Sequence, residues 1–359
     1  MIVEDILEPD LPIIDAHHHM WDMRAVQPLP GADRHPAALS VKPAMHYMLD
    51  QLLADVRTGH NVIATVYMEC RAFSRASGPD ELRPVGETEV VNGVAAMTAS
   101  GIYGEFRACA GIVGHADLDL GDRAAEVLQA HIDAGGGRFR GVRHIGAWDE
   151  DPWVVWPSHV GQGLYRQEHF RRGFARLAPL GLSFDVWVIE PQLADVIDLA
   201  RAFPETAIVL DHCGGPVGIG RYQGKREERF PTWRASMAQL ADCPNVVVKI
   251  GGLGYSFANF PSLLAEPRFS SVRLADQWRP YVDACIELFG ADRCMFESNF
   301  PPDMGSCSYP TLWNAFKRLA AGASADEKAS LFSETARRVY RLELPALSES
   351  PAPESKESQ

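Results

Sequence analysis

Short runs of apolar, often β-branched residues alternate along the chain with longer amphipathic stretches. Eight of these runs have the length of strands, and they cover residues 11–16, 61–67, 106–113, 139–144, 183–188, 207–210, 245–250 and 294–297. Most of them are continuously apolar, which is typical of parallel strands that are buried on both faces. The pattern therefore predicts a parallel sheet with connections long enough for helices.

The stretches between the strands carry helix signals. Residues 43–59 begin with a proline in the first turn and end at a glycine, and residues 119–135, 191–203 and 275–290 are punctuated in a similar way. After the last strand, helices are expected over residues 311–322 and 324–342, and Ser324 and Glu327 have the spacing of a capping box.

This alternation predicts an α/β fold, a (β/α)8 TIM barrel that forms a single domain over residues 1–345 with long βα loops. An open, doubly wound sheet is the alternative. It is less favoured because no G-x-G-x-x-G follows the first strand and because polar residues recur at the carboxyl ends of the strands. Residues 346–359 are rich in Pro, Ser and Glu and are expected to be a disordered tail.

The composition narrows the classes of partner. A formal net charge of −13 argues against nucleic-acid binding, since phosphate recognition needs a basic surface, but a few arginines still permit an anionic small-molecule substrate. Seven cysteines without a C-x-x-C pair are typical of reduced thiols. No signal peptide and no apolar run of about 20 residues is visible, so we expect a cytoplasmic protein that has no membrane partner.

In such a barrel the active site lies at the carboxyl ends of the strands. The first strand ends in Asp15-x-His17-x-His19, and alternation along a strand places these three residues on one face, toward the mouth of the barrel. His18 then points into the barrel wall. A single histidine would more often be a core residue, but an i, i+2 pair at a strand end favours a site.

Other strand ends add candidates. Arg143 is expected to face inward from the fourth strand, where either a substrate carboxylate or an internal Asp or Glu would pair with it. His212 precedes a glycine pair after the sixth strand, and Glu297 and Asn299 share a face at the eighth. Lys249, in the apolar seventh strand, is costly to bury unless it is paired or used.

Several of these segments together resemble a known family. The segments D-x-H-x-H-x-W, R-G-V-R-H, D-H-C-G-G-P and S-N-F-P resemble the second amidohydrolase family, and more narrowly its lactonase branch, which includes pyrone-dicarboxylate and sugar-acid lactonases. The resemblance spans about residues 11–342 and implies the same barrel fold. By motif it carries His17, His19, Arg143 and His212 over as site residues.

The resemblance also bears on metal binding. The superfamily often binds one or two divalent metals through such histidines and an aspartate on the eighth strand, whereas some lactonases work without metal and polarise the carbonyl directly. Here Asn299 stands in place of that aspartate, and an amide does not accept a proton at neutral pH. The resemblance therefore implies at most one ion, most readily zinc, held by His17, His19, His212 and Glu297, with a metal-free site as the alternative. Asp303 and Glu69 are weaker substitutes for the missing aspartate.

These residues suggest a hydrolase of the amidohydrolase type that opens a lactone, or a related bond, in a small carboxylated substrate. His17, His19 and His212 would polarise the carbonyl, Arg143, aided by Arg71, would anchor a carboxylate, and Glu297 would activate a water that Asn299 orients. The alternatives are a lyase (a decarboxylase or hydratase of an unsaturated or aromatic acid) and a barrel that only binds a metabolite.

The aromatic stretch and the oligomeric state both concern the surface of the protein. The aromatic stretch 148–156 fits a lid over the mouth and fits a subunit contact equally well. Barrels of this size often pair, so a homo-oligomer is one of the partners considered besides the small-molecule substrate.

Overall fold

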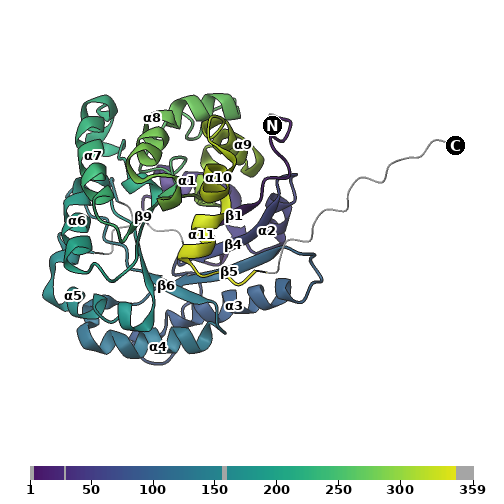
Figure 1. The fold of residues 1–359 in the computed structure, drawn as a ribbon. Coiled ribbons are helices and arrows are strands. Elements are labelled where there is room, and N and C mark those ends of the chain that lie inside the picture. The colour runs from purple at the N-terminus through teal and green to yellow at the C-terminus, as the bar shows by residue number, and fades with distance from the viewer. Residues whose placement is uncertain (1–3, 28–29, 156–159, 345–359) are drawn as a thin grey trace.

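The computed structural model describes residues 4–27, 30–155 and 160–344. Its main sheet holds eight strands in the order β1-β4-β5-β6-β7-β8-β9-β10 (Figure 1). They are β1 (Ile13–His18), β4 (Val62–Met68), β5 (Arg107–Gly114), β6 (Phe139–Arg143), β7 (Ser183–Val186), β8 (Ile208–Leu210), β9 (Val246–Ile250) and β10 (Cys294–Phe296). The spatial order follows the chain order, so the doubly wound alternative is wrong.

The sheet closes on itself where its first strand meets its last. The backbone N–H of Asn299 donates to the carbonyl of His17 at 2.9 Å, and the N–H of His19 donates to the carbonyl of Phe300 at 2.8 Å. These bonds continue the parallel ladder past the end of β10. The predicted (β/α)8 barrel is therefore confirmed, and its closure lies directly beside the two predicted site histidines.

Helices surround the strands (Figure 1). They are α1 (Pro36–Val41), α2 (Leu49–Val56), α3 (Val85–Ala99), α4 (Ala124–Ala134), α5 (Glu168–Phe174), α6 (Leu193–Ala202), α7 (Arg226–Ala241), α8 (Ser271–Phe289), α9 (Tyr309–Leu319), α10 (Ala325–Ala329) and α11 (Thr335–Val339). The helix expected from Pro43 begins only at Leu49, because β3 (His46–Tyr47) first pairs with β2 (Trp21–Asp22).

The last predicted helix has the expected start and an unexpected interior. Ser324 and Glu327 form the capping box, with the Ser324 side chain accepting the N–H of Glu327. A π-helical segment at Ser330–Glu334 then separates α10 from α11. The predicted helix is therefore confirmed over residues 325–339, with a π-helical turn in its middle.

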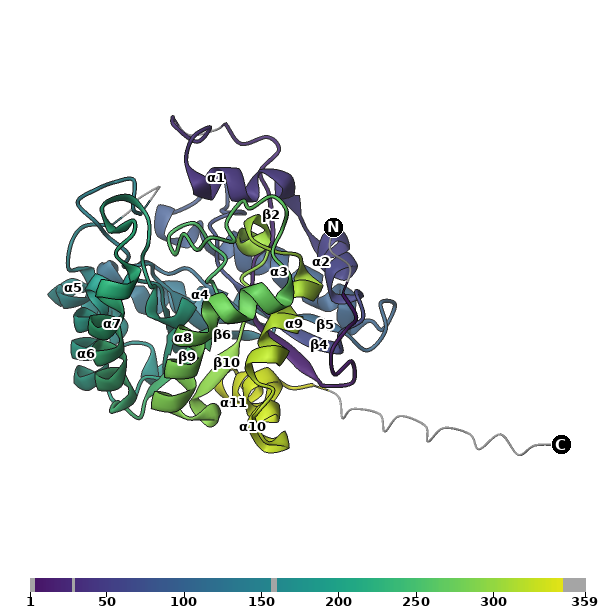
Figure 2. The same cartoon turned by 90° about the horizontal axis from the view of Figure 1, so that it is seen from above.

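The two ends of the barrel differ. Tyr340 and Leu342, which follow α11, pack into the interior with Ile14, Val209 and Met295 from the strands. Figure 2 shows α10 and α11 at one end of the molecule and α1 with β2 at the other. The loop after β1 carries β2 and α1, so the carboxyl ends of the strands, and with them the mouth of the barrel, lie at that end.

Three further predictions concern the chain as a whole. All seven cysteines are free thiols, and six of them are buried. Within the described ranges, we find no helix that is both long enough and apolar enough to cross a bilayer. The predicted tail at 346–359 lies outside the described residues, as does Trp156 of the aromatic stretch.

Candidate active site

The first strand places its three histidines as alternation predicts. His17 and His19 face the mouth, with their Nε2 atoms 3.2 Å apart. His18 points into the wall, where its Nε2 lies 2.9 Å from the hydroxyl of Thr65. All three side chains are buried, so the chemistry of this strand end is available only to a ligand that enters the barrel mouth.

Glu297 joins two of the histidines. Its Oε1 lies 2.7 Å from Nδ1 of His212 and also accepts the His212 backbone N–H at 3.1 Å. Its Oε2 lies 2.8 Å from Nδ1 of His17. The His212 ring packs against Gly252, where a Cβ would lie 2.3 Å from its Nδ1. A glycine at position 252 therefore gives the ring the space to meet Glu297.

Arg143 has internal carboxylate partners. Its Nε donates to Oε1 of Glu69 at 2.8 Å, and its Nη1 donates to Oδ2 of Asp211 at 3.2 Å. The same Nη1 lies 3.4 Å from Nε2 of His17. Of the two kinds of partner considered for this arginine, the structure provides the internal one, so the guanidinium is already bound before any substrate arrives.

Lys249 is fully buried and paired, which meets the condition under which a lysine is tolerated in an apolar strand. Its Nζ lies 2.7 Å from Oδ1 of Asp185 and 3.2 Å from Oδ1 of Asp211. The hydroxyl of Tyr340 donates to the same Asp185 oxygen at 2.5 Å. Through Lys249, which lies 3.3 Å from Nδ1 of His17, this ion-pair network reaches the site.

Asn299 lies between a histidine and a carboxylate. Its Oδ1 is 3.3 Å from Nε2 of His19, and its Nδ2 donates to Oδ1 of Asp303 at 2.7 Å. On the other side of the His19 ring, Nδ1 lies 2.9 Å from the carbonyl of Met68. The backbone of Asn299 has a φ of 50°, a left-handed value that asparagine tolerates better than most residues.

Burial and charge set the protonation of these groups. Burial, aided by the ammonium of Lys249, lowers the pKa of His17, and burial lowers the pKa of His19 further. Burial alone would raise the pKa of Glu297, but the adjacent His212 and His17 bring it below its usual value. Burial raises the pKa of Asp303 to about 7. His17 and His19 are thus neutral at pH 7, while Glu297 is charged.

The charges around His17 leave room for a cation. The carboxylates that pair with the side chain of His17, Arg143 or Lys249 are Glu69, Asp185, Asp211 and Glu297, and the cations of this network are Arg143 and Lys249. Four carboxylates against two cations leave an excess of two negative charges, or of one where Asp185 is protonated. A divalent ion would balance that excess.

Two further observations agree with a cation. His17, His212 and Glu297 offer ligand atoms that all lie within 4.8 Å of one another. The Nε2 atoms of His17 and His19 also converge at the mouth, where they lie 3.2 Å apart. Two histidine nitrogens and a carboxylate oxygen are a donor set that zinc accepts.

Aromatic side chains line the approach to the histidines. The Trp21 ring stacks on His19 at 6.0 Å, and the Phe257 ring lies 6.0 Å from the ring of His212. Trp187 in turn contacts Phe257 edge to face at 5.7 Å. Apolar ring faces therefore lie next to polar nitrogen and oxygen atoms, which is the usual composition of a small-molecule site.

The loop that holds the predicted aromatic stretch reaches two neighbouring loops at the mouth. The carbonyl of Trp153 lies 2.9 Å from Nε2 of His35, in the loop after β1. Asp149 accepts hydrogen bonds from Arg221 at 2.9 Å and Tyr222 at 2.7 Å, both in the loop after β8. These contacts place the described part of the stretch beside the mouth, and whether it also meets a second subunit stays a prediction.

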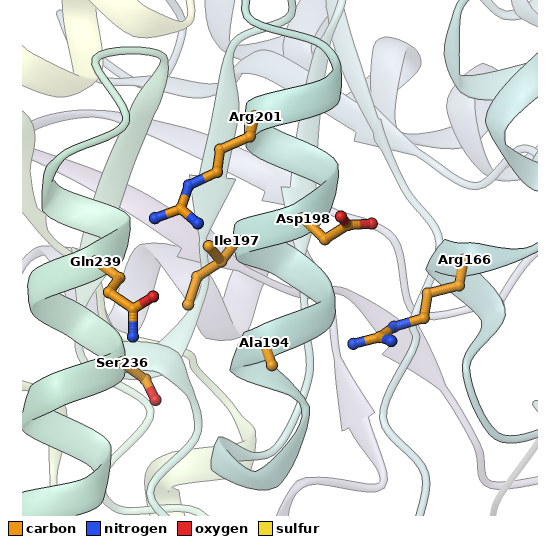
Figure 3. A pocket seen from close by; sticks show the side chains of 7 residues that line it. All are labelled: Arg166, Ala194, Ile197, Asp198, Arg201, Ser236 and Gln239. Carbon is orange, nitrogen blue, oxygen red and sulfur yellow. The ribbon is translucent and has the colours of Figure 1, made fainter.

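The hollows on the outer surface are separate from this site. Figure 3 shows one of about 310 Å³ beside α6 and α7. It is lined by Arg166, Ala194, Ile197, Asp198, Arg201, Ser236 and Gln239. None of these residues belongs to the histidine cluster, so we assign no catalytic role to this hollow.

Comparison with known proteins agrees with the geometry. The family model described as Amidohydrolase matches residues 14–342. The chain belongs to the amidohydrolase family. This amidohydrolase is therefore an enzyme of the hydrolase type, and the resemblance seen in its motifs is confirmed.

Two relatives cover nearly all of this amidohydrolase. An uncharacterized protein of Sinorhizobium fredii is 33% identical over 340 residues, which are 93% of this chain and 99% of that protein. An L-fucono-1,5-lactonase of Burkholderia multivorans is 28% identical over 345 residues, which are 93% of this chain and 97% of that enzyme.

Solved structures share the fold. An amidohydrolase from Burkholderia multivorans with bound zinc superposes with a TM-score of 0.68 at 25% identity, over 92% of this chain and 99% of that chain. A 5-carboxyvanillate decarboxylase from Sphingomonas paucimobilis superposes with a TM-score of 0.55 at 14% identity, over 93% of this chain and 100% of that chain. At 14% identity the second match shows the barrel alone.

The site assembled in this way is larger than the sequence suggested. His17, His19, Arg143, His212, Glu297 and Asn299 all lie in one contact network. Asp185, Asp211 and Tyr340 belong to it as well, although their positions in the sequence did not indicate a role. The one signal that pointed toward them was Lys249, whose burial required carboxylate partners.

Proposed function

We propose that this amidohydrolase opens the ring of a lactone by attack of water at the ester carbonyl. The observation that carries the proposal is the cluster of His17, His212 and Glu297 at the mouth of the barrel, where hydrolases of this fold do their chemistry. The similarity to an L-fucono-1,5-lactonase over nearly the whole chain supports a cyclic ester as the substrate.

The histidines have the chemistry to polarise the carbonyl. His17 and His19 are neutral, and each can offer a ring nitrogen to an electrophile or, in the N–H form, donate to an oxyanion. A divalent ion held by His17, His19, His212 and Glu297 would polarise the carbonyl and lower the pKa of a bound water. Direct polarisation by the ring N–H groups is the metal-free form of the same proposal.

The attacking water must lose a proton, and the ring oxygen must gain one. We assign proton acceptance to Glu297, the carboxylate that contacts both His17 and His212. Asn299 orients the water through its amide. The new C–O bond forms at the carbonyl carbon, the ring C–O bond breaks, and the proton passes from Glu297 to the departing ring oxygen, which becomes an alcohol.

The contacts of Arg143 bear on the kind of lactone. Since Glu69 and Asp211 bind its guanidinium, Arg143 contributes positive charge but does not offer a pair of N–H donors to a substrate carboxylate. Arg71, after β4, is exposed and makes no hydrogen bond or ion pair with another described residue. Flat aromatic faces at Trp21 and Phe257 suit a sugar ring. The sugar-acid lactones are therefore the first substrates to test, and carboxylated lactones, with Arg71 as their anchor, the second.

The test offers the protein a panel of lactones and measures hydrolysis as proton release with a pH indicator. The panel contains 1,5- and 1,4-sugar lactones and a pyrone dicarboxylate, and carbon dioxide is recorded in parallel from aromatic and unsaturated carboxylic acids. Proton release with at least one lactone supports the proposal. Carbon dioxide release without ring opening of any lactone would replace it with the lyase alternative.

A further inference from the structure

Asn299 and His19 face each other with atoms that both accept hydrogen bonds. The carbonyl of Met68 can only accept, so the His19 nitrogen beside it, Nδ1 at 2.9 Å, carries the proton. The opposite nitrogen of the neutral ring, Nε2, is then a bare lone pair. That lone pair lies 3.3 Å from Oδ1 of Asn299, which is also an acceptor.

A free asparagine would relieve this conflict by turning its amide through a half-turn. The –NH₂ group would then donate to Nε2 of His19. Asp303 opposes that turn, because its Oδ1 accepts from Nδ2 of Asn299 at 2.7 Å and its Oδ2 accepts the backbone N–H of Gly254 at 2.9 Å. With the amide reversed, two oxygens would meet at Asp303 instead.

The position of Asp303 is itself firmly determined. The residue is fully buried, and its N–H donates to the carbonyl of Asn299 at 3.1 Å, so one short turn links the two side chains. A Cβ at Gly254 would lie 2.7 Å from Oδ2 of Asp303, so only a glycine admits the carboxylate this close. Among the described residues, no Lys or Arg forms an ion pair with Asp303.

The separations at this meeting point are those of ligands around one ion. Nε2 of His19 lies 3.2 Å from Nε2 of His17 and 3.3 Å from Oδ1 of Asn299. Two ligand atoms that are each about 2.0 Å from a tetrahedral zinc ion lie about 3.3 Å from each other. Acceptors held at this spacing by outer contacts suit a divalent cation placed between them.

We propose that Asp303 is a positioning residue, which holds the Asn299 amide so that its oxygen, with the Nε2 atoms of His17 and His19, forms a binding site for a divalent cation. The proposal rests on the proposed function only for the use of the ion in lactone opening. It adds Asn299 and Asp303 to the residues that serve that ion, one through its oxygen and the other through the orientation of that oxygen.

The experiment measures the zinc affinity of metal-stripped protein at pH 8 by competition with a chromophoric chelator. Asp303→Asn can no longer accept both N–H groups, so we expect a 10- to 100-fold weaker affinity. Asn299→Ala, which leaves the Asp303–Gly254 contact in place, should lose a similar amount. The double variant N299A/D303N should be no weaker than either single variant, because both remove the same oriented oxygen.

An exchange variant separates orientation from a general loss of structure. N299D/D303N places a carboxylate at position 299 and an amide at position 303. It should therefore bind zinc at least tenfold more tightly than D303N. Asp55→Asn serves as the matched control, because Asp55 is a half-buried aspartate of α2 that accepts the hydroxyl of Tyr47, and this variant should bind zinc as the wild type does. Circular dichroism confirms that each variant is folded.

The outcomes are distinct from those of the lactone panel. Wild-type affinity in both D303N and N299A, or an exchange variant no tighter than D303N, would overturn the role of Asp303. A folded wild-type protein without zinc affinity would overturn the cation site, while lactone hydrolysis by direct histidine polarisation would stand. A protein that binds zinc tightly but hydrolyses none of the lactones would overturn the proposed function and leave the cation site in place.

Discussion

Oε1 of Glu297 lies 2.7 Å from Nδ1 of His212, and this contact connects the last strand of the barrel with the turn after β8. The same carboxylate reaches His17 at 2.8 Å through its other oxygen. One buried side chain therefore fixes the relative positions of two histidines that are 195 residues apart in the sequence. The role of Glu297 in the reaction is the first matter to test.

Replacing Glu297 with glutamine should lower kcat on a lactone substrate by about 10²- to 10⁴-fold, the usual contribution of a general base. The amide keeps the size of the side chain but does not accept the proton of water. Steady-state kinetics measure the loss. Asp55→Asn, at a carboxylate of α2 that accepts the hydroxyl of Tyr47, is the control and should keep kcat within about threefold. Full turnover by E297Q would show that Glu297 is not the base.

The Lys249 network should matter for stability. Lys249→Met removes the cation between Asp185 and Asp211 and leaves two carboxylates buried without it, so we expect a loss of about 3–5 kcal/mol in the free energy of unfolding. The double variant D185N/K249M should regain part of that loss, because one of the unpaired charges is gone. Urea unfolding measures both. A loss of less than about 1 kcal/mol in K249M would contradict the pairing.

The sequence allowed the barrel to be predicted closely, because its strands are buried on both faces and read as continuous apolar runs. The run expected at 245–250 forms β9 (Val246–Ile250), and the run at 106–113 forms β5 (Arg107–Gly114). The short pair β2 and β3 was missed. Two residues in each strand are too few for a periodic pattern, and the pairing depends on where the loop after β1 folds back.

The site shows the same division between local and long-range information. His17 and His19 could be predicted because strand alternation is a local property, and the structure places both at the mouth. The partners of Arg143 could not be predicted, because Glu69 and Asp211 come from strands whose register around the barrel is fixed only by packing. Asp303 was considered a weak substitute for an aspartate, since nothing local shows that it binds the Asn299 amide.

Stability should depend on pH through Asp55, a residue of α2 that does not contact the histidine cluster. Burial raises the pKa of this carboxyl from 3.8 to about 6, opposed by its hydrogen bond from Tyr47. Its folded-state pKa is above the unfolded value, so its contribution is complete below pH 3.8 and is lost as the pH rises through 6. Between pH 4 and pH 7 the wild type should therefore lose about 2 kcal/mol relative to Asp55→Asn.

Urea denaturation of both proteins at several pH values measures that difference. Asparagine can still accept the hydroxyl of Tyr47 through its amide oxygen, so the comparison isolates the proton. A difference in the free energy of unfolding that is independent of pH between 4 and 7 would show that Asp55 titrates normally in the fold.

The most direct test of the whole account compares two neighbouring histidines of β1 in the opening of L-fucono-1,5-lactone, or of whichever lactone in the panel reacts fastest. His17 faces the cluster, while His18 is bound to Thr65 in the wall. We predict that His17→Asn lowers kcat/KM by at least about 100-fold, and that folded His18→Gln stays within about threefold of the wild type. Equal losses in the two variants, or an active His17→Asn, would contradict a hydrolytic site at the histidine cluster.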